Sequence, residues 1–464
     1  MKWLQFAFGL ALGGVLVARA ADLRAGAAVV EITPELGTPI AGYYSERGAD
    51  GVHDPLNAKV IVLESGGTKA ALVSLDLIST LRETVEEARR LIESETGIPG
   101  RNVMISATHS HTGPTLAGTR RFDALGGTHE KAVRFTEELP KKIAAAVAEA
   151  AKNLQAAEAR YGSREEHRLA FNRRFHMRDG SVGWNPGKLN PNIVRVAGPT
   201  DPEVQVVYFS GGKNDAIATY VNFPIHLDTT GGTHFSADFP FALSESLARA
   251  KSAEMMTMFT MGCSGDVNHI DVSSRAPQKG PQEAARIGTI LAANVLRTFE
   301  TLRTNQGSGL RVSSEMVELP IPPVTDDEVA EARKIAERVA ARSQPAPRFM
   351  DQVKAFKVLD VHARAGKPHE VEVQVIALGE EIAWVSLPGE IFVELGLSIK
   401  AGSPFKQTII ASLANGSVGY IPTVRGYSEG NYEAISSRCA PGSGELLVAS
   451  AIRQLRQLRR GLND

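Results

Sequence analysis

The sequence predicts an α/β fold built from layered mixed sheets flanked by helices. Short runs rich in Val, Ile and Ala alternate with longer amphipathic stretches, an order typical of strands that pack against helices. Hydrophobic residues make up 43% of the 464 positions and charged residues 22%, so the chain has enough apolar material for a large buried core. The composition therefore argues against a disordered or fibrous protein.

Several strands and helices are predicted before residue 309. The strands are short apolar runs near turn residues, expected at residues 58–63, 70–75, 103–107, 204–209, 216–223 and 256–261. Amphipathic periodicity indicates helices at residues 84–96, 129–154 and 282–302. In the second of these helices Val133, Leu139 and Ile143 fall on or near one face.

After residue 309 the pattern changes, but no linker divides the chain. We expect a strand, a Pro-rich turn, a charged helix with a solvated face, two further strands and a C-terminal helix, at residues 310–319, 321–323, 326–342, 371–378, 382–387 and 444–460. The Pro-containing stretch at residues 343–348 is expected to be a surface loop, because candidate site residues fall on both sides of it. Residues 21–464 are therefore predicted to form one domain.

The first 20 residues are typical of a secretory signal. Lys2 precedes an apolar run at residues 3–17, and Ala18-Arg19-Ala20 resembles a cleavage site with small residues. The apolar run is shorter than the roughly 20 residues that a membrane-spanning helix needs. We expect cleavage near residue 21 and a secreted or periplasmic protein without a stable membrane span; an uncleaved anchor is the alternative.

The charge balance and the cysteine content exclude some binding partners and some ways of stabilising the fold. Lys plus Arg total 51 and Asp plus Glu total 52, so the overall balance does not attract the chain to nucleic acid or to an anionic membrane. Cys263 and Cys439 are the only cysteines, so no disulfide framework organises the fold. They either form a single bridge or remain two unpaired core residues. The oligomeric state is left open.

A histidine pair follows the predicted strand at residues 103–107. His109 and His111 lie in Thr108-His109-Ser110-His111-Thr112-Gly113-Pro114, and in extended chain residues i and i+2 point the same way. The pair can supply a metal ligand and a neighbouring acid–base group. A chance occurrence at a strand edge is the alternative.

Two further segments each add a candidate metal ligand. His226 ends a second β-like run, and Glu390 follows a strand and the turn Pro388-Gly389. Catalytic zinc takes His nitrogens and a carboxylate while one position stays open for water. Glu390 has a simpler alternative as a carboxylate that faces a helix N-terminus.

These segments resemble the neutral (non-lysosomal) ceramidase family. Residues 108–114 resemble its Thr-His-Thr-His-Ser-Gly-Pro segment. Other landmarks follow in the family's order and span most of the chain: Gly51-Val52-His53-Asp54, Asn172-Arg173, His226, Gly265-Asp266-Val267, Pro388-Gly389-Glu390, Tyr420-Ile421-Pro422-Thr423 and Tyr432-Glu433. The ordered set is more specific than any single match.

The resemblance implies a zinc-dependent hydrolase that cleaves an N-acyl amide through attack by zinc-bound water. It places zinc on two imidazoles, a carboxylate and a phenol, namely His109, His226, Glu390 and Tyr420. It also implies catalytic roles for three neighbours. His111 would carry a proton to the leaving amine, while Arg173 or Tyr432 would donate to the oxyanion.

This chain departs from the family at one position that bears on mechanism. Asn268 stands where the ceramidases have Ser after Gly-Asp-Val, so a covalent route through that position is closed. Ser264 does not replace it, because Asp266 occupies the place of the final glycine in a Gly-x-Ser-x-Gly elbow. We also expect no counterpart of the family's C-terminal immunoglobulin-like domain.

The substrate is expected to be a small-molecule or lipid amide, such as an N-acyl sugar, lipid or peptide-like compound, and ceramide itself is not assigned. An esterase or lactonase that uses the same metal-bound water is one alternative. A non-catalytic, metal-binding relative of the same fold is another. Four more side chains are expected close to the site: His53, Asp76, Asp238 and His269.

Overall fold

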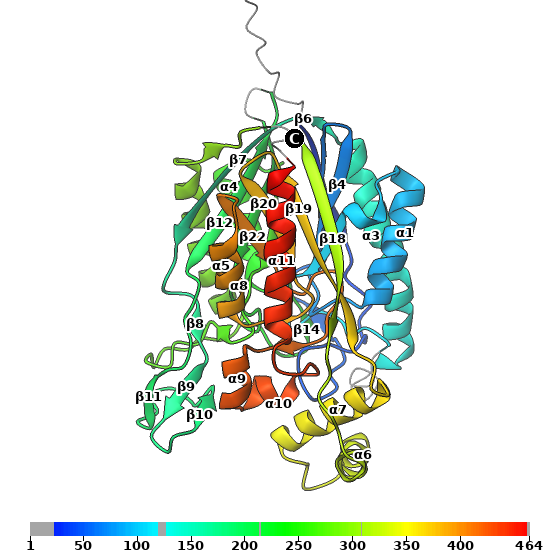
Figure 1. Cartoon of the computed structure of the whole chain (residues 1–464), viewed down its shortest axis with the longest axis vertical. Coiled ribbons are helices and arrows are strands. Elements are labelled where there is room, and N and C mark those ends of the chain that lie inside the picture. Colours follow the sequence, from blue (N-terminus) through cyan, green and yellow to red (C-terminus); the bar gives the residue numbers. More distant parts are fainter. Residues whose placement is uncertain (1–22, 119–126, 213–214, 308, 462–464) are drawn as a thin grey trace, which may run out of the picture.

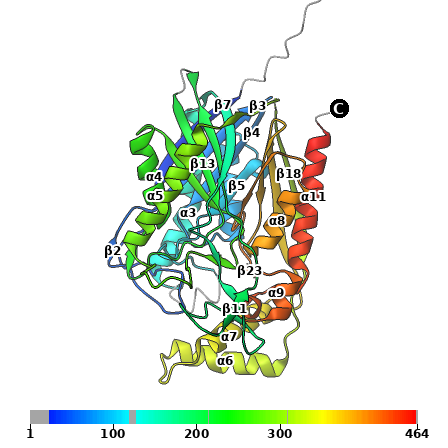
Figure 2. The same cartoon turned by 90° about the vertical axis from the view of Figure 1, so that its left-hand side faces the viewer.

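The computed structural model describes residues 23–118, 127–212, 215–307 and 309–461 (Figure 1). The predicted signal segment at residues 1–20 lies outside this described part of the chain. Two five-stranded sheets and one four-stranded sheet form the body of the molecule, and helices cover their outer faces (Figures 1 and 2). The predicted α/β fold of layered mixed sheets flanked by helices is confirmed.

The first sheet is assembled from the N-terminal part of the chain. Its strand order is β5 (Val103–Ala107), β4 (Thr68–Leu75), β3 (Asn57–Ser65), β1 (Arg24–Glu31) and β6 (Gln155–Ala156). β4 and β5 are parallel, and the other neighbours are antiparallel. Helices α1 (Arg82–Thr96) and α3 (Glu130–Lys152) pack together beside this sheet, and their apolar stripes join its core.

The second sheet carries the central histidine segment. Its order is β15 (Met256–Met261), β13 (Ala216–Phe223), β12 (Glu203–Ser210), β7 (Glu158–Glu165) and β17 (Arg303–Thr304), with β13 and β15 parallel. Helices α4 (Phe239–Ala250) and α5 (Pro281–Phe299) pack against each other on its outer side.

The third sheet comes from the C-terminal part of the chain. It runs β18 (Leu310–Leu319), β19 (His369–Leu378), β20 (Ile382–Ser386) and β22 (Gln407–Ala411), and it is covered by α8 (Val393–Gly402) and α11 (Ser443–Arg460). Trp384 of this sheet is fully buried, and the centre of its ring system lies 5.9 Å from that of Tyr220 in the second sheet; Ile61 of the first sheet belongs to the same apolar cluster. A single apolar cluster therefore joins all three sheets.

Short strand pairs tie distant segments together near one end of the sheets. β2 (Gly51–Val52) pairs with β14 (His234–Phe235), β8 (Phe171–Asn172) with β16 (Val267–Asn268), and β21 (Glu390–Ile391) with β23 (Tyr420–Ile421). The same end carries the small sheet of β9 (Arg174–Met177), β10 (Val182–Trp184) and β11 (Ile193–Val196). It also carries α6 (Asp326–Ala340), α7 (Phe349–Ala363), α9 (Val424–Glu429) and α10 (Tyr432–Ser436) (Figures 1 and 2).

The charged helix at residues 326–342 is present as α6, but it is not wholly solvated. Val329 and Ala332 are buried against α7, which the sequence did not predict. α7 buries residues on several faces, because it lies between α6 and the body, so it lacks the single apolar stripe that marks a surface helix. β1, β7, α4 and α8 were also not predicted.

Neither cysteine forms a bridge. Cys263 and Cys439 are free thiols, both buried, and burial raises the pKa of each to about 12. They are therefore unpaired core residues, the second of the two alternatives left by the sequence. Across the described residues no helix combines the length and apolar character needed to pass through a bilayer.

Candidate metal centre

His109 and His111 lie in the turn after β5, not in extended chain. β5 ends at Ala107, and His109 adopts a left-handed φ of 79°, so the expected i, i+2 alternation on a strand is wrong for this pair. The turn is fixed by backbone hydrogen bonds from His109 N to Leu77 O at 2.9 Å and from His111 N to Leu227 O at 3.1 Å. Both rings nonetheless reach one point, because the His111 Nε2 atom lies 3.3 Å from His109 Nε2.

His226, Glu390 and Tyr420 arrive from three other segments. His226 follows β13, and its Nε2 lies 3.0 Å from His109 Nε2. Glu390 and Tyr420 are directly paired across the short parallel strands β21 and β23. The Glu390 Oε2 atom lies 3.3 Å from Nε2 of both His109 and His226, and the Tyr420 Oη atom lies 3.4 Å from His226 Nε2. The four side chains that the resemblance assigned to zinc thus converge.

The hydrogen bonds behind the rings fix which nitrogen faces this point. His109 Nδ1 lies 2.7 Å from the Ile78 carbonyl oxygen and His226 Nδ1 lies 3.0 Å from the Ser264 carbonyl oxygen. A carbonyl only accepts, so in a neutral ring each Nδ1 carries the proton and each Nε2 presents a lone pair. Two lone pairs 3.0 Å apart repel each other unless a cation lies between them.

The donor set also fits a metal in spacing and chemistry. Glu390 Oε2 is buried and has no hydrogen-bond partner among the described residues. Ligands of a tetrahedral zinc at its usual bond lengths lie about 3.3 Å apart, which matches the separations here. The buried group of His109, His111 and His226 can hold a metal ion.

The charge states suit cation binding. Burial lowers the pKa of His226, and the Arg173 charge lowers it further; burial also holds the pKa of His111 well below its usual value. Both rings are therefore neutral near pH 7, the state that a metal ligand requires. Burial and the Glu390 charge raise the pKa of Tyr420 well above its usual value.

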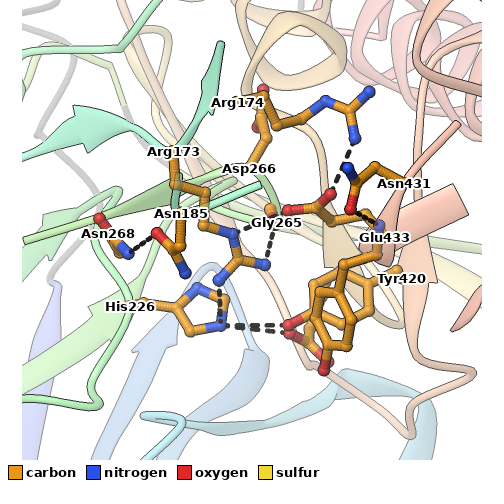
Figure 3. Close-up of polar contacts among 12 residues, drawn as sticks. Arg173, Arg174, Asn185, His226, Gly265, Asp266, Asn268, Tyr420, Asn431 and Glu433 are labelled. Atoms are coloured by element: carbon orange, nitrogen blue, oxygen red, sulfur yellow. Dashed lines mark hydrogen bonds and ion pairs between the residues drawn. The ribbon is translucent and has the colours of Figure 1, made fainter. Parts of the chain in front are cut away.

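Arg173 borders the same point (Figure 3), and Tyr432 lies next to Tyr420. Arg173 lies between β8 and β9, and its Nη1 atom is 3.4 Å from His226 Nε2. Tyr432 begins α10, and the centre of its ring lies 5.4 Å from that of Tyr420. The structure therefore brings all seven predicted site residues into one region.

The four other side chains that the sequence placed near the site, His53, Asp76, Asp238 and His269, lie at different distances from it. Asp76 is buried beside the histidine turn, where it accepts a hydrogen bond from Asn57 N at 3.0 Å, and burial raises its pKa to about 6. Asp238 caps α4. His53 is exposed and lies against His234, with 4.6 Å between ring centres and the ring planes tilted by 55°, and no contact joins it to the other site residues within the described chain.

His269 is buried and forms an ion pair with the partly exposed Asp228, which the sequence did not reveal. Its Nδ1 lies 3.1 Å from Asp228 Oδ1, and its Nε2 lies 2.7 Å from the Gln278 carbonyl oxygen. Burial alone would lower the pKa of His269, but Asp228 raises it. Asp228 follows His226 by two residues, so the spacing of the two was a signal that sequence analysis could have used.

Asn268 and Ser264 are both buried next to this region. Asn268 accepts a hydrogen bond from Ile270 N at 3.0 Å and donates one to Asn185 Oδ1 at 3.0 Å. The Ser264 hydroxyl has no hydrogen-bond partner among the described residues. Its neighbour Gly265 packs directly against the backbone of Glu390.

Gly265 permits the close approach that places Glu390. A Cβ at this position would lie 2.4 Å from the Glu390 carbonyl oxygen. We expect Gly265→Ala to lower the free energy of unfolding by about 1–3 kcal/mol and to weaken metal binding, because the Glu390 backbone must move. Gly212→Ala is the matched control, since a Cβ there meets no atom of the described residues within 4 Å. Thermal unfolding and metal titration check both variants; a Gly265→Ala protein that behaves like the control contradicts the prediction.

Comparison with known proteins identifies solved structures that are similar to this one. No family model and no curated protein matches the chain. The crystal structure of neutral ceramidase from Pseudomonas aeruginosa superimposes with a TM-score of 0.76 at 19% identity, over 95% of this chain and 75% of that one. A ceramidase complexed with C2 gives a TM-score of 0.74 at 17% identity, over 95% and 76%. The chain therefore has the fold of the neutral ceramidases.

Proposed function

We propose that this protein is a zinc-dependent hydrolase that cleaves an N-acyl amide bond. The observation that carries the proposal is the convergence of imidazole nitrogens, a carboxylate oxygen and a phenol oxygen, separated by 3.0–3.4 Å. The fold shared with two ceramidase structures supports amide hydrolysis as the reaction. Residues 21–464 would form this hydrolase as one domain.

The residues that would hold zinc are His109, His226, Glu390 and Tyr420. Two neutral imidazoles and a carboxylate are usual zinc ligands, and the protonated phenol is a weak fourth ligand that a substrate can displace. Zinc, when bound, supplies an activated water at neutral pH and polarises the carbonyl of the substrate.

The chain's own residues supply the remaining chemistry. His111 Nε2 faces the cluster and would take a proton there and deliver it to the leaving nitrogen. The Arg173 guanidinium and the Tyr432 hydroxyl would donate hydrogen bonds to the acyl oxygen as negative charge develops on it. Asn268 offers no nucleophile, which supports a route without a covalent intermediate.

Aromatic side chains beside the centre support an apolar group in the substrate. Tyr432 stacks on Trp184 with 4.3 Å between ring centres, and Phe349 lies 5.8 Å from Trp184 and 5.7 Å from Tyr432. Exposure rises from 8% at Tyr432 to 40% at Phe349, so the rings lead from the buried centre toward solvent. A small-molecule or lipid amide with an apolar acyl group suits this surface. Action outside the cytoplasm, after removal of residues 1–20, is part of the same proposal.

The function is tested by metal removal and by paired substrates. We expect about one zinc per chain after purification, loss of hydrolysis in a chelator, and recovery when zinc is restored. Amide and ester analogues with the same acyl group are then compared by kcat/KM. Full activity after complete chelation contradicts zinc dependence, and hydrolysis of the ester alone contradicts an amidase.

A further inference from the structure

Two arginines share one carboxylate directly behind the candidate metal centre (Figure 3). The Nε atom of Arg173 donates to Glu433 Oε1 at 2.9 Å, and Nη1 of Arg174 donates to Glu433 Oε2 at 2.8 Å. Glu433 has no exposed surface, and both arginines are buried. A carboxylate that accepts on both oxygens from guanidinium groups is in its ionised form.

Arg173 holds a fixed positive charge close to where a cation would bind. Its Nη1 lies 3.4 Å from His226 Nε2, and its guanidinium carbon lies 5.4 Å from the centre of the Tyr420 ring. Its Nη2 donates to the Gly265 carbonyl oxygen at 2.7 Å, which holds the group in place. A divalent cation and a guanidinium repel each other at such distances, and little water screens them in a buried site.

The other carboxylates near the two arginines have partners of their own, so Glu433 is the one that offsets the positive charge of Arg173. Arg174 also pairs with Glu429, whose Oε2 lies 3.2 Å from Arg174 Nη2. The carboxylate of Asp266 is engaged elsewhere, because it accepts from the Asn172 side chain and from Val393 N. Within the described chain Glu433 is the only carboxylate in ion-pair contact with Arg173.

We propose that Glu433 is the counter-charge that allows a divalent cation to bind beside Arg173. The inference rests on the proposed zinc site. Arg173 is placed to donate to the substrate, but its charge alone would oppose the metal. Glu433 offsets that charge and orients the guanidinium, while Glu429 offsets Arg174. Glu433 is therefore a positioning residue that acts through Arg173.

The test is the zinc affinity of four variants, measured by competition with a chromophoric chelator. Glu433→Gln should weaken zinc binding by about 10–100-fold, the range found when an outer partner of a metal site is lost. Arg173→Met should bind zinc at least as tightly as the unchanged protein, since the repelling charge is gone, yet lose hydrolytic activity. The double variant should recover most of the affinity lost in Glu433→Gln. Glu429→Gln is the matched control, because it removes a partner of Arg174 and Arg425 but none of Arg173, and it should leave zinc affinity unchanged.

The sign of the Arg173→Met effect separates electrostatics from simple support of the fold. If Arg173→Met and Glu433→Gln weaken zinc binding alike, and the double variant shows no recovery, Glu433 only supports the structure and the proposal is overturned. Unchanged zinc affinity in Glu433→Gln overturns this proposal and leaves the proposed function standing. An unchanged protein that binds no zinc overturns both. If Glu433→Gln does not fold, a loss of affinity in Arg173→Met alone is sufficient to overturn the proposal.

Discussion

Replacing His226 with alanine should remove the bound metal and the hydrolytic activity together. The Nε2 atom of His226 lies within 3.0–3.4 Å of His109, Glu390, Tyr420 and Arg173, so it is the most central donor of the cluster. Its loss leaves the Glu390 carboxylate without a second imidazole partner. We expect zinc affinity to fall by more than about 100-fold, beyond the usual cost of losing an outer partner.

The measurement for this variant is zinc content after gel filtration together with kcat/KM. His53→Ala is the matched control, because His53 is exposed and, among the described residues, its ring contacts the ring of His234 and none of the site residues. The control should keep both zinc and activity. Full zinc occupancy in His226→Ala would show that the ligand assignment is wrong, whatever its activity.

Replacing His111 with alanine should separate proton transfer from metal binding. His111 Nε2 lies 3.3 Å from His109 Nε2, but within the described part of the chain it makes no hydrogen bond or ion pair with Glu390 or Tyr420, so it stands at the border of the cluster. We expect the variant to retain zinc while kcat falls by about 10²–10⁴-fold, the usual contribution of a general acid–base group.

Chemical rescue distinguishes a role of His111 in proton transfer from a role as a metal ligand. Imidazole added to the His111→Ala protein should restore part of kcat, since the missing group is a proton carrier rather than an anchor. Loss of zinc in this variant would instead make His111 a third imidazole ligand. The grouping of His109, His111 and His226 allows that result, and it would displace Tyr420 from the proposed ligand set.

Much of the fold could be predicted because the signals are local. Strand β13 (Ala216–Phe223) is a short, mainly apolar run that is buried on both faces, and helix α1 (Arg82–Thr96) has the apolar periodicity that its one-sided burial requires. Helix α7 could not be predicted in the same way, because its burial by α6 and by the body removes the contrast between faces. Tertiary packing, rather than propensity, determines that element.

The sequence named side chains that the structure brings together, but it did not predict how they meet. The resemblance named His109 and Glu390, whereas their approach depends on a left-handed turn at His109 and on the pairing of β21 with β23. No short-range pattern encodes a two-residue strand that pairs 30 positions away. The same holds for Glu433, whose partners Arg173 and Arg174 lie about 260 residues earlier in the chain.

Anomalous diffraction from crystals of the purified protein, recorded on both sides of the zinc absorption edge, tests the central claim most directly. The proposed site predicts one strong anomalous peak bonded to Nε2 of His109 and His226, to Glu390 and to the Tyr420 oxygen. A protein with full hydrolytic activity and no anomalous peak among these four side chains would contradict it.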